Sequence, residues 1–176
     1  MTLDGTCGEL RLGCGGLPES WRETDDLTYA IRQVSRTDTA GMFNYSTPLG
    51  LPALREQILK RLHQLDIEVD QRQIVTTTGA THALDLIVRT LLKPRDSVVV
   101  ESPGYSRLFD LLRLNGVTML EVPRTPRGPD TQALEALLVK YRPRALFINS
   151  VDHNPTGSSL TPVVAQQVLQ LTKAHG

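Results

Sequence analysis

The stretch RALFINSVDHNPTG, residues 144–157, joins an apolar run to a polar loop. Its first part, Ala145 to Ile148, has the continuous apolar character of a strand that is buried on both faces. Its last part contains Asn-Pro and Thr-Gly pairs, which are ordinary turn residues. A plain strand-to-helix turn explains this composition as well as a ligand-binding loop does. The choice between these two interpretations depends on motifs elsewhere in the chain.

Apolar residues elsewhere alternate between extended and helical spacing. The pattern predicts strands over residues 74–77, 97–101, 117–122 and 144–149. It predicts helices over residues 27–34, 51–65, 80–92, 105–115, 130–142 and 162–174. Regular alternation of strands and helices is typical of a parallel sheet with helices on its faces. The sequence therefore predicts the α/β class, with three α/β/α layers and a mainly parallel sheet.

Short signals mark where several of these helices begin or end. Thr24, Asp25 and Asp26 precede the first helix and can cap it. Thr161-Pro162 combines a capping residue with a first-turn proline at the start of the last helix. Asn115-Gly116 is a helix stop before the third predicted strand.

Composition excludes several classes of protein. The 176 residues carry a formal net charge of zero, so this chain lacks the basic surface that binds nucleic acid. No apolar stretch is long enough to cross a bilayer and the start lacks a signal-peptide pattern, so a cytoplasmic protein is expected. Cys7 and Cys14 are expected to be free thiols, and the four histidines lack ligand spacing, so no metal site is predicted.

Residues that follow the strands are the candidates for a binding site, because ligands of open α/β sheets collect at the carboxyl ends of the strands. In TTTGATHALDLI, Gly79 stands between a predicted strand and a predicted helix. The N–H groups of Ala80 and Thr81, with the helix dipole, could hold an anion such as phosphate. A capped helix with a close-packing glycine is the alternative.

Two other strand ends also carry distinctive chemistry. Tyr105, in ESPGY, could stack on a flat ring or could pack in the core, and Asn154, in HNPTG, offers an amide to a ring oxygen. The stretch Arg124 to Arg127 is typical of a solvated loop. The carboxylates are scattered over predicted helix faces, so no acid–base pair is predicted.

Four segments, in this order, resemble the large domain of fold-type I pyridoxal-phosphate aminotransferases: YSTPLGLPALREQILKRL, TTTGATHALDLI, VVVESPGYSRLFDLL and HNPTG. With LGCGGLPESW ahead and VPRTPRGPD between, the chain is most similar to the aminotransferase-like domain of the MocR regulators of the GntR superfamily.

The resemblance implies a set of cofactor-binding residues: Gly79, Ala80, Thr81, Tyr105, Asn154 and Tyr45. The first three would hold the phosphate, Tyr105 would stack on the pyridine ring, and Asn154 would bond its 3′-oxygen. Tyr45 would reach the phosphate of a twofold partner, which implies a homodimer. Gly16 would lie near the carboxylate of the substrate.

Departures from the family pattern limit what the resemblance implies. None of the lysines (Lys60, Lys93, Lys140 and Lys173) stands in the Ser-rich context of the family's Schiff-base lysine, so no catalytic residue is assigned and this chain is expected to be inactive alone. The chain is expected to be the amino-terminal part of the cofactor domain, with an arm and helix at 1–45 and the domain portion at 46–176. Asp152 adds a charge beside HNPTG, and the family's proline before this motif is missing.

Three functions from different classes remain open. The first is a sensing domain for pyridoxal phosphate or an amino-acid adduct, in a regulator that contacts DNA through a separate domain. The second is part of a transaminase that acts on amino acids and 2-oxo acids. The third, a dinucleotide-binding domain, is disfavoured, because no G-x-G-x-x-G follows a strand and no G-K-[ST] loop occurs.

Overall fold

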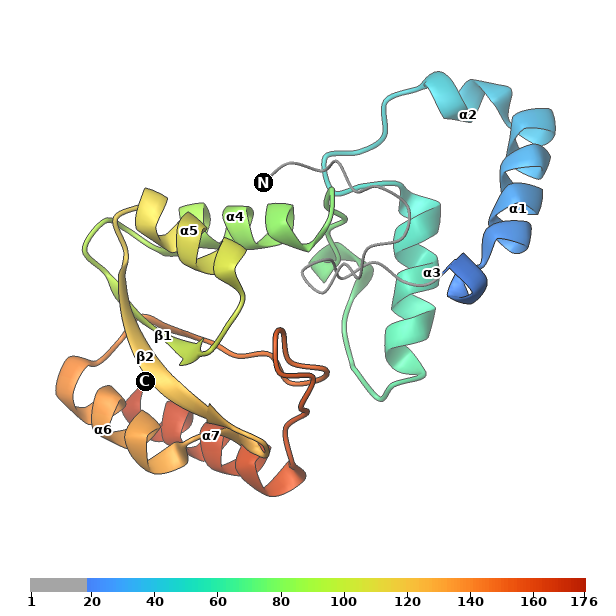
Figure 1. Ribbon diagram of the computed structural model, residues 1–176. Coiled ribbons are helices and arrows are strands. Elements are labelled where there is room, and N and C mark those ends of the chain that lie inside the picture. Colours follow the sequence, from blue (N-terminus) through green and yellow to red (C-terminus); the bar gives the residue numbers. More distant parts are fainter. Residues whose placement is uncertain (1–18) are drawn as a thin grey trace, which may run out of the picture.

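The computed structural model describes residues 19–176 (Figure 1). The elements follow one another as η1 (Glu19–Trp21), α1 (Thr24–Thr37), α2 (Thr39–Phe43), α3 (Pro52–His63), η2 (Gln71–Gln73), α4 (Ala80–Leu91), β1 (Ser97–Ser102), α5 (Ser106–Leu114), β2 (Thr118–Thr125), β3 (Gly128–Pro129), α6 (Thr131–Tyr141), β4 (Ala145–Phe147) and α7 (Pro162–His175).

A four-stranded sheet in the order β3-β2-β1-β4 forms the middle layer. The central strand β1 runs parallel to both β2 and β4, while the short β3 pairs antiparallel with the end of β2. Helices α4 and α5 cover one face and α6 and α7 cover the other (Figure 1). The predicted three-layer α/β fold with a mainly parallel sheet is confirmed.

Burial of β1 on both faces explains its continuous apolar run. Val98 and Val100 pack into the cluster that contains residues of α4 and α5. Val99, between them, points to the opposite face and packs with Leu134 of α6 and Val168 of α7. Side chains alternate along a strand, so one apolar run fills two cores at once.

Helix boundaries follow the predicted signals in two places. Thr161 accepts a hydrogen bond from Val164 N, and Pro162 occupies the first turn of α7. Helix α5 ends at Leu114 with Asn115 as its C-cap, and Gly116 then adopts a left-handed φ of 68°. Such a conformation favours glycine because a Cβ would be strained there.

The predicted capping of the first helix is wrong. Helix α1 begins at Thr24, its N-cap is Glu23, and no side chain caps it. Asp25 and Asp26 therefore lie inside the first turn, where their negative charges interact favourably with the helix dipole and stabilise the helix.

The predicted strand over residues 74–77 is also wrong. A strand needs a neighbouring strand, and none within residues 19–176 pairs with this segment. Its backbone groups find other partners: Ile74 O accepts from Arg55 Nε at 2.8 Å, and Thr76 N donates to Leu49 O at 3.0 Å. The segment is extended but is held by α3 and by the turn that precedes it.

Helices α1 and α2 lie apart from the sheet (Figure 1). Every residue from 20 to 49 whose side chain the structure describes is exposed. Across residues 19–176, no helix combines the length and the apolarity that crossing a membrane would require.

Candidate functional site

The order of the strands creates a crevice at one edge of the sheet. From β1 the chain passes through α5 to β2 on one side, and later returns to β4 on the other side of β1. Helix α5 packs on one face, whereas α7, which follows β4, packs on the opposite face. The loops after β1 and β4 therefore part in opposite directions, which is where open α/β sheets bind ligands.

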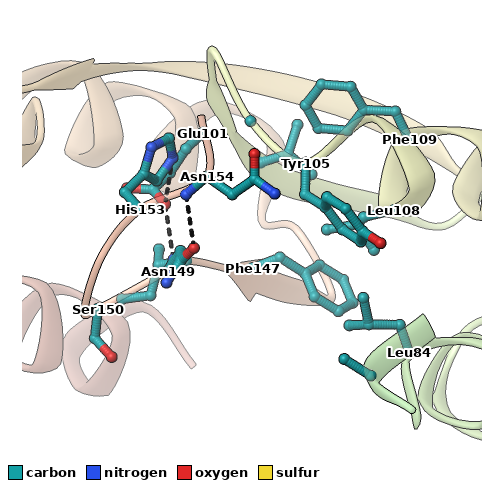
Figure 2. A pocket seen from close by; sticks show the side chains of 14 residues that line it. Leu84, Glu101, Tyr105, Leu108, Phe109, Phe147, Asn149, Ser150, His153 and Asn154 are labelled. Atoms are coloured by element: carbon teal, nitrogen blue, oxygen red, sulfur yellow. Dashed lines mark hydrogen bonds and ion pairs between the residues drawn. The ribbon is translucent and has the colours of Figure 1, made fainter. Parts of the chain in front are cut away.

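A cavity of about 510 Å³ occupies this crevice. Its lining comes from the start of α4, the end of β1, the start of α5 and the loop after β4: Ala80, Leu84, Val100, Glu101, Gly104, Tyr105, Leu108, Phe109, Phe147, Ile148, Asn149, Ser150, His153 and Asn154. Figure 2 shows apolar and aromatic side chains on one side and the polar groups of Glu101, Asn149 and His153 on the other.

The start of α4 supplies backbone donors to the cavity. Gly79, its N-cap, adopts φ 87° and ψ 168°, a conformation open to glycine alone. The first intrahelical bond runs from Ala83 N to Gly79 O, so the N–H groups of Ala80 and Thr81 have no acceptor within the helix. Free N–H groups at a helix start, aided by the dipole, bind anions such as phosphate.

Tyr105 packs against the core and also lines the cavity. Its ring packs against the core cluster of α4, α5 and β1, and it also lines the cavity beside Phe147 (Figure 2). Its hydroxyl lies 3.1 Å from Thr81 Oγ1, which links the start of α5 to the start of α4. The ring is thus tied to the start of α4.

Asn154 reaches the cavity from the loop between β4 and α7. Its backbone N–H donates to Asn149 Oδ1 at 3.0 Å (Figure 2), and Asn149 Nδ2 donates to Val151 O at 2.7 Å. The Asn149 amide therefore shapes the loop from within, and the Asn154 side chain remains available to a ligand.

A buried ion pair behind the cavity was missed by sequence reasoning. Arg124 Nη1 donates to Glu101 Oε1, and the side chains are 0% and 3% exposed. The prediction that Arg124 belongs to a solvated loop is wrong: β2 extends through Thr125, so Arg124 lies beside β1 and under the loop after β4. Glu101, at the end of the apolar run of β1, was the available signal, because a buried carboxylate needs a partner.

His153 completes the polar wall and is 2% exposed. Its Nδ1 lies 2.9 Å from Thr156 Oγ1 and 3.4 Å from Thr156 N, which ties the ring to its own loop. Nε2 lies 3.5 Å from Glu101 Oε2, so the ring can donate toward the carboxylate.

The predicted site residues do not all meet in this cavity. Ala80, Tyr105 and Asn154 line it, while Gly79 and Thr81 flank Ala80 without lining it. The Tyr45 side chain is fully exposed, and Gly16 lies outside the described residues. Among residues 19–176 no group of three metal-ligating side chains occurs.

The residues present fit a phosphorylated aromatic ligand. The cavity has the volume of ordinary small-molecule sites. A Cβ added at Gly79 would meet no atom within 4 Å, so the space beside the helix start is open for a phosphate. Flat apolar walls and one amide complete the set of groups that pyridoxal phosphate requires.

The fold and the crevice define an α/β cofactor-binding domain of the kind found in fold-type I transferases. The model of the family aminotransferase class I and II matches residues 9–176, and the chain belongs to this family.

Individual relatives fall into two groups. The 2-aminoadipate transaminase of Thermus thermophilus is 32% identical over 92% of this chain and 40% of its own length. The uncharacterized HTH-type transcriptional regulator YdcR of Escherichia coli is 34% identical over 85% of this chain and 32% of its own length. The chain thus spans about two fifths or less of these relatives.

A solved structure shares the arrangement described above. The alpha-aminoadipate aminotransferase of Thermus thermophilus, complexed with N-(5′-phosphopyridoxyl)-L-leucine, has a TM-score of 0.82 and 32% identity. The match covers 92% of this chain and 41% of that chain.

Proposed function

We propose that this chain is the pyridoxal-phosphate-binding part of an aminotransferase-like protein, and that its parent is a regulator of the MocR type within the GntR superfamily. The observation that carries the cofactor proposal is the cavity, because Ala80, Tyr105 and Asn154 come from three separate segments and meet there. The regulator is supported by relatives such as YdcR, whose name states an HTH-type transcriptional regulator.

Each of these groups has a distinct role in this proposal. The N–H groups of Ala80 and Thr81 hold the phosphate, the Tyr105 ring lies along the pyridine, and the Asn154 amide donates to the 3′-oxygen. When bound, the cofactor supplies an electron sink for an amino group attached to it. The residues of this chain orient the cofactor and exclude water from the apolar face of its ring.

Titration with pyridoxine 5′-phosphate tests the binding proposal, because this probe has no aldehyde and cannot react with surface lysines. Tyr105→Ala and Asn154→Ala are each expected to weaken binding about fivefold, the worth of one stack or one hydrogen bond. Tyr141→Ala, on helix α6 outside the cavity, is the matched control and should bind like the wild type. Absence of wild-type binding, or equal affinity in all variants, would refute the proposal.

The alternative is a transaminase, favoured by the 2-aminoadipate transaminase of Thermus thermophilus. A regulator and an enzyme differ in the turnover of the complete parent protein, which coupled measurement of amino-group exchange between an amino acid and a 2-oxo acid detects. We expect none from this chain, because its lysines lack the context of the family's Schiff-base lysine. A robust rate from the purified chain would favour the enzyme instead.

Assembly is proposed to be a homodimer in which Tyr45 reaches the partner's phosphate. Its exposed hydroxyl has no competing role within the described chain, and Leu49 O, four residues later, accepts from Thr76 N near the anion-binding turn. Tyr45→Phe is then expected to weaken binding of the probe while the sedimentation coefficient stays that of a dimer. Unchanged binding would remove Tyr45 from the site.

Two further proposals concern organisation and location. The exposure of the residues described before position 50 supports a division into an arm at 1–45 and the domain portion at 46–176. The composition supports a cytoplasmic protein that meets DNA only through a separate domain.

A further inference from the structure

The Arg124 side chain is buried behind the cavity and does not line it. We infer that Arg124 is a positioning residue, which holds Asn154 in place through Glu101 and Asn149. The inference rests on the proposed function in one respect: the position of Asn154 affects binding only if the cavity takes a phosphopyridine ligand. The contacts themselves are independent of that proposal.

The first link is between the ion pair and the backbone of Asn149. Asn149 N donates to Glu101 Oε2 at 2.8 Å. Asn149 O accepts from Arg124 Nη1 at 2.9 Å. The same Arg124 Nη1 also donates to Glu101 Oε1. Glu101 thus binds the N–H of Asn149 and Arg124 binds its carbonyl oxygen, so the peptide units on both sides of Asn149 are fixed.

The second link is between Asn149 and Asn154. With its backbone fixed, Asn149 directs Oδ1 at Asn154 N, 3.0 Å away (Figure 2). Its Nδ2 donates to Val151 O. An amide side chain has a defined donor end and a defined acceptor end. A rotation of the Asn149 backbone would therefore break both bonds together.

The third link ties the far end of the loop to the same guanidinium. Arg124 Nη2 donates to Ser158 O at 3.1 Å, and His153 N donates to the same oxygen at 2.9 Å. Residues 149 and 158 are thus held by the two terminal nitrogens of one side chain. Asn154 lies midway between these two fixed points.

Arg124 Nε is buried and has no partner among residues 19–176. All the hydrogen bonds of this guanidinium come from its terminal nitrogens, and apart from the bond to Glu101 all of them go to the loop. Apolar residues often replace a buried ion pair without loss of stability. An apolar side chain could therefore replace Arg124 in the packing of the core. It could not replace the hydrogen bonds that Arg124 donates to Asn149 and Ser158.

Arg124→Lys is the variant that separates charge from direction. Lysine keeps the positive charge next to Glu101, but it lacks the fork that reaches two carbonyl oxygens at once. A second variant, Glu101→Met with Arg124→Met, removes the ion pair and keeps an apolar core. Arg113→Met, which breaks the exposed pair of Arg113 with Asp110 on α5, is the matched control.

Amide hydrogen exchange measures the position of the loop without any ligand. In Arg124→Lys and in the double variant, the N–H groups of Asn149 and Asn154 are expected to exchange at least about tenfold faster than in the wild type. Amides in the middle of β1, such as that of Val99, should keep their protection, as should all of these amides in Arg113→Met.

Binding of pyridoxine 5′-phosphate then tests whether Arg124 acts through Asn154. Arg124→Lys should weaken binding about fivefold, as Asn154→Ala does, and should cause no further loss in the Asn154→Ala background. A merely structural role would give additive losses.

The outcomes separate the two proposals. If the wild type does not bind the probe, the proposed function fails, while the exchange of Asn149 and Asn154 still tests the positioning. Unchanged exchange in folded variants, or additive losses of affinity, would overturn the inference. Loss of cooperative unfolding in both variants would overturn it as well, because the ion pair would then serve the whole fold.

Discussion

Substitution of Gly79 by alanine tests the conformation on which the proposed anion-binding turn depends. Gly79 adopts φ 87° and ψ 168°, and a Cβ there would meet no atom within 4 Å. The cost therefore comes from the backbone alone and not from a clash. An L-residue held in this region costs about 1–3 kcal/mol, so Gly79→Ala should lower the free energy of unfolding by that amount.

The sign of this effect is informative. Where the native backbone suits alanine, replacing glycine stabilises a protein by about 0.4–1 kcal/mol, because the unfolded chain loses freedom. Urea denaturation followed by circular dichroism gives the free energy of unfolding, provided that the slope with denaturant is unchanged. Equal or increased stability of Gly79→Ala would refute the assigned conformation.

Ligand binding provides a second measurement on the same variant. Relaxation of φ toward negative values would turn the Ala80 N–H away from the phosphate. Affinity for pyridoxine 5′-phosphate should fall about tenfold, the worth of a bond to a charged group. Gly116→Ala is the control: it has a comparable left-handed φ of 68°, but it stands at the far end of α5. It should lose stability and keep its affinity.

Three other predictions follow from burial, capping and charge. Leu134→Ala, at a side chain with 0% exposure, should cost about 2–5 kcal/mol, whereas Leu169→Ala, 70% exposed on α7, should change the denaturation midpoint little. Asp130→Ala removes the side chain that accepts from two N–H groups at the start of α6 and should cost about 1 kcal/mol in the same assay. The hydrogen bond from the Arg72 side chain lowers the pKa of Asp70. The stabilisation that the ionised Asp70 gives the folded state is present above the pKa of the unfolded state and is lost as pH falls through the pKa of the folded state. The free energies of unfolding of the wild type and Asp70→Asn, measured against pH, should therefore converge in acid.

Local patterns were sufficient to predict most of the secondary structure. The helices after positions 51, 80, 105, 130 and 162 and three of the four predicted strands are present. Apolar periodicity, the capping of α7 by Thr161 and the stop at Gly116 all depend on residues close together in sequence. The order of motifs also indicated the family that matches residues 9–176.

Partners from distant segments could not be predicted in this way. The segment 74–77 has the composition of a strand, but its Ile74 carbonyl is bound by the side chain of Arg55, nineteen residues earlier. A strand is defined by a neighbour, and periodicity carries no information about which segment that neighbour is.

Arg124 shows most clearly what only the tertiary structure decided. In the sequence it stands between Pro123 and Thr125 in a stretch that is typical of an exposed loop. The register of β1 with β2 pairs Ser102 with Pro123, which brings the guanidinium to Glu101 beneath the loop that carries Asn154. Local sequence determined which residues form helices and strands, because those preferences act over a few residues. The register between strands decided which charged side chains meet. This pairing matters because a buried charge without a partner costs the folded state several kcal/mol.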